Sequence, residues 1–398
     1  MIKDNKHEYL IFQIISLMIC FYAMGSIEMV GIASNYVKVE LNISDAKANL
    51  LPSLVYIWFI VCTVPTGYLM DMIGRKRTVI LSMFLMMIAM IFPFFGDSYS
   101  LMICCFILLG IGNVCMQTSL YPLISNVINE NHLASNLTLG QFVKTLSSFS
   151  APYVAMLGAL YLTKFTGIGW RVLFVFYFIV TFIAIAFLWY SKIENVKDNE
   201  RVTTYLESFS LLKHKFILLS FIGVICHVGI DISTNTIAPK LMMYRTGVEI
   251  EKASFAASLY FIARLLGCLS WSIFLKKVSR KLFFYISIAL ILFAMVGLYF
   301  AKTEVSIYSC IFMIGIGNAN LFPVLFSQAV LSQPDKHNII SVLMIMGQAG
   351  GAVFPILMGL AFDKVGLFGS ISVLLIGVAY LVFFAIKLGL NKSSLQNN

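Results

Sequence analysis

The sequence has few charged residues. Of its 398 residues, only 12% are Asp, Glu, Lys or Arg, whereas 60% are hydrophobic, and the mean hydropathy is +0.91. Soluble domains carry about 25% charged residues, so this composition excludes a soluble globular protein. The chain is expected to be an integral membrane protein in contact with lipid, without a soluble basic domain that could bind nucleic acid.

Catalytic and nucleotide-binding motifs are also missing. The sequence contains no His-Glu-x-x-His, no Gly-x-Ser-x-Gly and no Gly-x-x-x-x-Gly-Lys, which are the motifs of zinc proteases, serine hydrolases and ATP-binding loops. We therefore expect no enzyme activity and no cofactor. Any transport would be driven by an ion gradient or by the gradient of the solute itself.

Cysteine chemistry is not indicated either. All eight cysteines lie in hydrophobic stretches, and no two are spaced as Cys-x-x-Cys. We interpret them as small buried apolar residues rather than as disulfides or metal ligands. No metal site is expected.

Long hydrophobic segments, by contrast, run through the whole sequence. A helix that crosses a bilayer needs about 20 apolar residues, whereas barrel strands are shorter and alternate polar with apolar residues. We predict an all-α membrane protein with twelve transmembrane helices, the first of them an uncleaved helix rather than a signal peptide. The predicted spans cover residues 10–34, 48–70, 78–96, 100–128, 134–163, 168–191, 214–243, 252–275, 281–301, 304–332, 338–363 and 366–388.

A polar break between Ser191 and Lys215 divides the chain. It predicts an N-terminal six-helix bundle at residues 1–192, a cytoplasmic linker at 193–213 and a C-terminal six-helix bundle at 214–398. Lys and Arg are more frequent in the loops on the side of this linker, and such an excess marks the cytoplasmic side of a membrane protein. Both termini are therefore expected in the cytoplasm, and the cell (inner) membrane is the expected location.

The two halves contain repeated motifs. Gly110-Ile-Gly-Asn113 recurs as Gly315-Ile-Gly-Asn318, and the pair Arg75-Lys76 recurs as Arg280-Lys281, in both cases 205 positions later. Two independent matches at one offset indicate an internal repeat. Parallel repeats of six spans are typical of transporters that hold their solute near the middle of the membrane, between the repeats.

A short charged segment, Gly67-Tyr-Leu-Met-Asp71-Met-Ile-Gly74-Arg75-Lys76-Arg77, joins the second and third predicted spans. Its composition alone fits an ordinary basic loop on the cytoplasmic side. Its spacing, however, resembles the loop signature between the second and third helices of the major facilitator superfamily. The resemblance implies a transporter in which an Asp and an Arg latch the two bundles together, and the implied latch residues are Gly67, Asp71, Gly74, Arg75 and Lys76.

Four charged residues lie deep within predicted spans, away from their ends: Glu28, Lys144, Asp231 and Arg264. Such residues are costly in lipid and usually face the interior of the bundle or a water-filled cavity. They are candidates for ion coupling, above all Glu28 and Asp231. The alternative is that they form ion pairs between helices that only fix the packing.

Polar residues recur at helical spacing, so that they share one face of a span. Three spans carry such a face, formed by Asn113, Gln117 and Tyr121, by Gln141, Lys144 and Ser148, and by His227, Asp231 and Asn235. Together these faces predict a polar cavity for a hydroxyl-rich solute, although each alone could be polar contact between helices. The candidate substrate-binding residues are Asn113, Gln117, Tyr121, Gln141, Lys144, Asn235, Arg264, Asn320 and Gln348.

Several stretches resemble one branch of the superfamily, the fucose–galactose–glucose:proton symporters. They include Asn35-Tyr-Val-Lys38, Pro65-Thr-Gly67, Leu139-Gly-Gln141, Ile262-Ala-Arg264 and Asn320-Leu-Phe-Pro323. The resemblance implies that the glutamine at 141 contributes to sugar binding. It also shows two departures, because Gln117 stands at the place of the branch's coupling glutamate on the fourth helix, and Glu28 lies about one turn before the place of its first-helix aspartate.

The sequence thus predicts a secondary transporter that imports a monosaccharide or related sugar by proton symport and alternating access. The open alternatives are an efflux antiporter for drugs or metabolites, a transporter of anionic sugar acids, and a sensor built on a transporter scaffold. Sodium could replace the proton. We expect a monomer.

Overall fold

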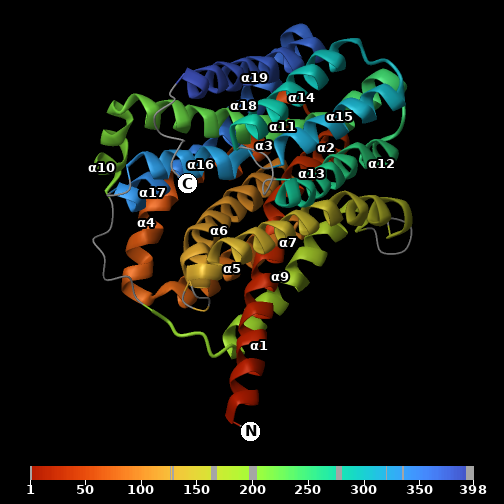
Figure 1. Cartoon of the computed structure of the whole chain (residues 1–398). Helices are drawn as coiled ribbons and strands as arrows, with labels where there is room; N and C mark the ends of the chain where they lie inside the picture. Colours follow the sequence, from red (N-terminus) through yellow and green to blue (C-terminus); the bar gives the residue numbers. More distant parts are fainter. Residues whose placement is uncertain are drawn as a thin grey trace. The chain divides into compact units, whose positions relative to one another are not determined.

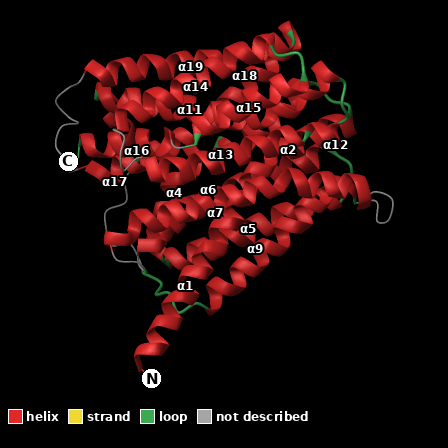
Figure 2. Ribbon diagram, turned by 45° about the vertical axis from the view of Figure 1, so that its right-hand side comes forward, coloured by secondary structure: helices red, strands yellow, loops and turns green. Residues whose placement is uncertain are grey.

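The computed structural model describes residues 2–125, 127, 130–162, 168–196, 204–274, 280–319, 321–333 and 336–390. The regular structure of these residues consists of helices (Figures 1 and 2). Among them, ten helices are long and apolar enough to cross a membrane, and two shorter apolar helices cover Phe284–Phe300 and Glu304–Asn318. Each of these twelve segments falls on one predicted span, so the all-α, twelve-helix prediction is confirmed. The largest difference is in the tenth span, predicted to end at 332, where the apolar helix ends at Asn318 and a separate helix follows at Leu321–Ser332.

The backbone divides into two compact units. Unit 1 contains Met1–Val30 and Trp58–Val202, and unit 2 contains Gly31–Ile57 and Thr203–Asn398. The end of the first span and the start of the second span, residues Gly31–Ile57, therefore group with the C-terminal helices. The simpler division at residues 192 and 214 stays a prediction.

Unit 1 holds the first helix and the helices of the third to sixth spans, together with the second part of the second span. Short 3-10 or π segments continue several of these helices where the hydrogen-bond pattern changes. The helices are α1 (Ile2–Met24), η1 (Gly25–Glu28), α4 (Trp58–Ile73), α5 (Arg75–Ile91), η2 (Phe92–Phe94), α6 (Tyr99–Ser125), α7 (Glu130–Leu157), η3 (Gly158–Leu162), η4 (Gly169–Arg171) and α9 (Val172–Tyr190).

Unit 2 holds the hairpin of α2 and α3 and the later helices. The Ser44 side chain caps α3 by accepting from the Lys47 N–H at 3.4 Å, and Gly247 ends α11 in the left-handed conformation that glycine favours. The helices are α2 (Met29–Leu41), α3 (Asp45–Tyr56), α10 (Tyr205–Ser210), η5 (Leu211–Lys213), α11 (Lys215–Thr246), α12 (Ile250–Ala253), α13 (Phe255–Phe274), α14 (Arg280–Phe300), α15 (Glu304–Asn318), α16 (Leu321–Ser332), α17 (His337–Met346), η7 (Gly347–Ala349), α18 (Gly350–Val365) and α19 (Leu367–Leu390).

The sequence repeat corresponds to the same helix contact in each unit. In unit 1, a Cβ at Gly112 of α6 would lie 2.9 Å from the Ser82 carbonyl oxygen of α5. In unit 2, a Cβ at Gly317 of α15 would lie 2.7 Å from the Ser287 carbonyl oxygen of α14. Glycine lets two helix backbones approach closely in a membrane protein. Gly112 and Gly317 are 205 positions apart, and so are Ser82 and Ser287, which is the offset of the repeated motifs.

The hairpin of α2 and α3 packs tightly on the later helices of unit 2. A Cβ at Gly351 of α18 would lie 2.6 Å from the Tyr56 ring, and Ser53 Oγ of α3 donates to the Ala352 carbonyl at 2.8 Å. Asn35 Nδ2 of α2 donates to the Thr236 carbonyl of α11 at 3.1 Å. Small residues and side chain to backbone hydrogen bonds therefore attach this hairpin to α11 and α18.

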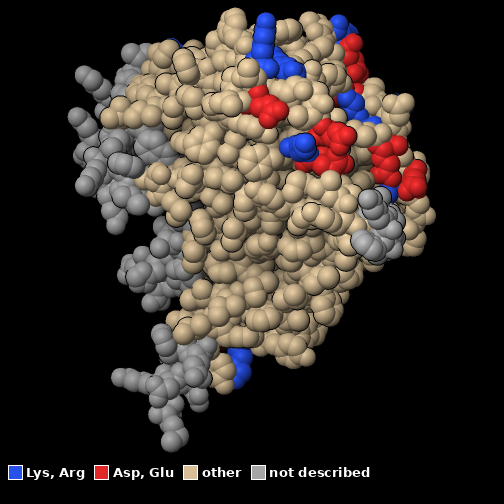
Figure 3. Space-filling model, turned by 90° about the vertical axis from the view of Figure 1, so that its right-hand side faces the viewer, with Lys and Arg blue, Asp and Glu red and all other residues tan. Residues whose placement is uncertain are grey.

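The surface carries the charge distribution of a membrane protein. Uncharged side chains cover a broad area of the face in Figure 3, while the acidic and most of the basic side chains lie in its upper right part and one more basic side chain lies at its lower end. Lipid tails accept an apolar surface, and charged side chains belong at the headgroup level or beyond. The chain is an integral, multi-pass membrane protein.

Candidate functional site

Glu28 of unit 1 lies where the first span tightens. The α-helix α1 gives way to the 3-10 helix η1 at Gly25–Glu28, and Glu28 is only 5% exposed. A Cβ at Gly25 would lie 2.6 Å from the Lys144 carbonyl oxygen, so the glycine is what lets α7 approach. This approach brings Lys144 Nζ to 3.8 Å from Glu28 Oε1. The two residues predicted from their charge therefore form an ion pair in which Glu28 is buried and Lys144 is half-buried.

Amide side chains lie on the neighbouring face of α6. Asn113 Nδ2 donates to the Met24 carbonyl at 3.0 Å, and Gln117 Nε2 donates to Asn113 Oδ1 at 2.8 Å. From α7, Gln141 Nε2 donates to the Tyr121 hydroxyl at 2.8 Å. Gln117 Oε1 is buried and accepts no hydrogen bond from a described residue. It is an open acceptor within a polar cluster that contains six of the predicted residues.

Unit 2 contains a second ion pair, between the buried Asp231 and the half-buried Arg264. Arg264 Nη1 of α13 lies 3.0 Å from Asp231 Oδ2 of α11, and the Tyr260 hydroxyl donates to the other oxygen of the same carboxylate. Helices α13 and α15 lie so close together that a Cβ at Gly315 would be 2.6 Å from the Ala263 methyl group. The glycine permits this approach. The carboxylate therefore has a partner on each oxygen.

Asn318 and His227 extend this network. Asn318 Nδ2 donates to the Tyr260 hydroxyl at 2.9 Å, and Asn318 Oδ1 faces His227 Nδ1 at 2.8 Å. Since an amide oxygen only accepts, Nδ1 of His227 is the donor in this hydrogen bond. The donors run in one direction, from His227 through Asn318 and Tyr260 to Asp231.

The remaining predicted binding residues are placed differently. Asn235 lies one turn along α11 from Asp231, and its amide nitrogen would be 2.9 Å from a Cβ at Gly31 of α2. Gln348 is buried in η7, at the joint between α17 and α18, and makes no side-chain hydrogen bond to another described residue. Asn320 lies outside the described residues.

The loop between α4 and α5 is held by the segment that follows α9. Gly74 has a φ of 90°, and Asn195 Nδ2 donates to the Ile73 carbonyl beside it at 2.7 Å. Arg75 Nη1 donates to the Pro122 carbonyl at 3.1 Å, and Lys76 Nζ donates to the Ser191 carbonyl at 2.6 Å. Gly67 and Asp71 lie in α4, before the turn. The turn is thus fixed by contacts within unit 1.

Several residues of these networks were not among the sequence candidates. Asn318 had a signal, since it is the repeat partner of Asn113. Tyr260 had a weaker one, because it lies four residues before Arg264 and so on the same face of α13. Asn195 had none, because a short polar linker predicts neither a helix nor a contact.

Comparisons with known proteins agree with this architecture. Residues 14–355 match the family model described as Major Facilitator Superfamily. A glucose/galactose transporter of Brucella abortus biovar 1 (strain 9-941) is 22% identical over 390 residues, which is 94% of this chain and 93% of the relative.

Solved structures share the fold. The nucleoside transporter NupG has a TM-score of 0.75 at 15% identity, covering 96% of this chain and 100% of its own. The E. coli fucose:proton symporter FucP has a TM-score of 0.64 at 16% identity, covering 94% of this chain and 99% of its own. At these identities the likeness concerns the fold.

The ion pair between Asp231 and Arg264 can be tested by its effect on the stability of the protein. Asp231→Asn removes the carboxylate beside the half-buried Arg264 guanidinium. Loss of one partner costs about 3–5 kcal/mol in a fully buried pair and less in a pair that water partly reaches. We expect a lower melting temperature for the purified protein. The double variant Asp231→Asn with Arg264→Gln should recover part of the loss, because it leaves no lone charge. Equal melting temperatures for wild type and Asp231→Asn would contradict the pairing.

Proposed function

The chain belongs to the major facilitator superfamily, a family of membrane transporters, and we propose that it imports a monosaccharide or related neutral sugar by proton symport. In this proposal the protein alternates between states that open to either side of the membrane. The chain lies in the cell (inner) membrane with both termini in the cytoplasm. The transported partners are the sugar and a proton.

The observation that carries the proposal is the balance of charge in the buried clusters. Lys144 lies beside Glu28, and Arg264 lies beside Asp231, so each described cation of these clusters has a carboxylate close by. An anionic solute would have to compete with these carboxylates. A neutral solute with many hydroxyl groups matches the amides, the Tyr121 hydroxyl and the open acceptor of Gln117.

The names of related proteins support the same class of solute. The Brucella relative is a glucose/galactose transporter, and one structural neighbour is a fucose:proton symporter. The nucleoside transporter among the neighbours carries a solute that also contains a sugar ring. A sugar therefore explains both the buried polar groups and the relatives better than a hydrophobic drug does.

We assign roles as follows. The amide and hydroxyl groups hydrogen-bond the sugar hydroxyls, and Lys144 and Arg264 serve mainly as partners of the two carboxylates. Glu28 carries the proton, because a carboxylate that loses its cation in a low-dielectric site is better accommodated as the neutral acid. Sugar contact is proposed for Asn113, Gln117, Tyr121, Gln141, Asn235, Asn320 and Gln348.

Transport of labelled sugar separates the proposal from its alternatives. We expect purified protein in liposomes to accumulate a labelled hexose when the outside is made more acidic than the inside. A sensor would bind sugar without flux, an exporter would move solute only outward, and a sodium symporter would respond to an imposed Na⁺ gradient instead. Each of these results would overturn proton-driven import.

Glu28 can be tested within the same assay. Glu28→Gln preserves the shape of the side chain but cannot exchange a proton, so accumulation under a pH gradient should fall to the level seen without a gradient. Exchange of labelled for unlabelled sugar should continue, since binding and alternation remain. Glu194→Gln changes an exposed glutamate of the same unit and should transport like wild type. Full accumulation by Glu28→Gln would assign the proton to another group.

We also propose that the α4–α5 loop acts as a latch, in which Asp71 and Arg75 stabilise one of the alternating states, with Gly67, Gly74 and Lys76 shaping the turn. Asp71→Asn should then shift the population of states and slow turnover several-fold, by roughly the factor that a loss of about 1 kcal/mol gives. Sugar binding in detergent should be unchanged. Cysteine labelling from each side measures the population, and an unchanged pattern together with wild-type transport would exclude the latch.

A further inference from the structure

A cavity of about 400 Å³ lies in unit 2 at the ends of α2 and α11. Its polar lining consists of Asn35, Lys38, Asn42, Lys240 and Tyr244. Asn42 is exposed and Tyr244 is 55% exposed, so the cavity is accessible from outside the protein. Lys240 lies nine residues beyond Asp231 on the same helix, roughly 13 Å along its axis. The cavity is thus distinct from the network around Asp231.

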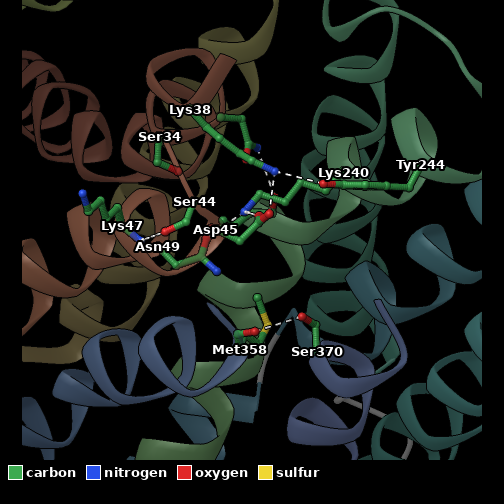
Figure 4. Close-up of polar contacts among 12 residues, drawn as sticks. Ser34, Lys38, Ser44, Asp45, Lys47, Asn49, Lys240, Tyr244, Met358 and Ser370 are labelled. Carbon is green, nitrogen blue, oxygen red and sulfur yellow. Dashed lines mark hydrogen bonds and ion pairs between the residues drawn. The ribbon is translucent and has the colours of Figure 1, made fainter. Parts of the chain in front are cut away.

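The ion pairs at this cavity leave a positive charge in excess. Lys38 Nζ lies 2.5 Å from Asp45 Oδ2, and Lys240 Nζ lies 2.6 Å from Asp45 Oδ1. Figure 4 shows both lysine side chains directed at this single carboxylate. Lys240 is only 4% exposed. The two ammonium groups and the carboxylate that they share have a net charge of +1. Such a charge is costly where water has limited access.

Neighbouring groups do not cancel this charge. The rings of Tyr244 and Phe362 lie 5.3 and 5.5 Å from Lys38 Nζ, and aromatic rings attract a cation without neutralising it. Asp363 also acts on Lys240, but it is exposed, where water and salt screen its charge. The excess charge therefore remains at the cavity.

Both lysines also keep capacity for a further hydrogen bond. Lys38 Nζ bonds to Asp45 and, at 3.1 Å, to the Tyr244 hydroxyl. Lys240 Nζ bonds to Asp45 and, at 2.9 Å, to Asn49 Oδ1. An ammonium group has three donors, so one donor of each lysine has no hydrogen-bond acceptor among the described residues.

Another residue of the same cavity lining, Asn35, has an unused acceptor. Asn35 is 3% exposed, and its Nδ2 is bonded to the Thr236 carbonyl. Its Oδ1 accepts no hydrogen bond from a described residue. A ligand that matches the cavity therefore brings one negative charge for the lysines and a hydroxyl donor for Asn35.

We propose that this cavity binds a hydroxylated carboxylate of the sugar-acid class. The carboxylate accepts the remaining donors of Lys38 and Lys240, so that two carboxylates balance two ammonium groups, and a hydroxyl donates to Asn35 Oδ1. The volume is in the range of small-molecule sites. This binding is separate from the import of a neutral sugar through the polar clusters described above.

The test uses the purified full-length protein and isothermal titration calorimetry with three probes at constant ionic strength. Gluconate has both the charge and the hydroxyls, acetate has only the charge, and glucose has only the hydroxyls. We expect gluconate to bind roughly tenfold more tightly than acetate, because it gains the bond to Asn35. Equal affinities for acetate and gluconate, or no gluconate binding, would overturn the proposal.

Variants locate the binding. Lys38→Gln removes the excess charge but keeps the pair of Asp45 and Lys240, so gluconate affinity should fall at least tenfold, while Lys38→Arg should retain most of it. Asn35→Asp, nearly identical in shape, should also abolish binding by adding a carboxylate. Lys47→Gln, on α3 but outside the cavity lining, is the matched control.

The outcomes separate this site from the transport site. Gluconate binding that survives Lys38→Gln and Asn35→Asp but disappears in Gln141→Ala would overturn the proposal, because it would place the ligand in unit 1. Each variant's melting temperature without ligand shows whether it is folded. Hexose uptake by liposomes is measured separately, so a failure of the proposed import leaves this result interpretable.

Discussion

The structure depends on one constraint: a polar group placed inside a membrane-spanning helix needs a partner. The chain meets it by pairing opposite charges on different helices, Lys144 with Glu28 and Arg264 with Asp231. It also uses amides whose two ends both make hydrogen bonds, as Asn113 and Asn318 do. Each such contact fixes which helices are neighbours, so the groups proposed to serve transport also determine the packing.

Glycine is the second requirement, because these short polar contacts need helix backbones that lie close together. Gly25 brings α7 towards Glu28, and Gly315 brings α15 towards α13. The repeat-related Gly112 and Gly317 make the same contact in each unit. Polar side chains and glycines therefore act together: the glycine permits the approach, and the polar pair makes one approach more favourable than the others.

The sequence predicted the helices well, because hydropathy and turn residues are local properties. It also identified most residues of the polar clusters, since charges and amides within spans are rare. It did not identify Tyr260, whose role depends on helices α11 and α15 lying next to α13. Nor did it reveal that α2 and α3 group with unit 2, because the contacts of Asp45 with Lys240 and of Asn35 with Thr236 join residues about 200 positions apart.

Because α2 and α3 group with unit 2, Glu28 lies close to the boundary between the two units along the chain. Unit 1 includes the first span up to Val30, and unit 2 begins at Gly31. Glu28 therefore lies at the end of a 3-10 segment, just before the chain passes from one compact unit to the other. A 3-10 turn within a longer helix often marks a hinge. A carboxylate at such a point can respond, through its pairing with Lys144, to a change in the path of the span. The proposed proton symport requires such a link between protonation and conformation.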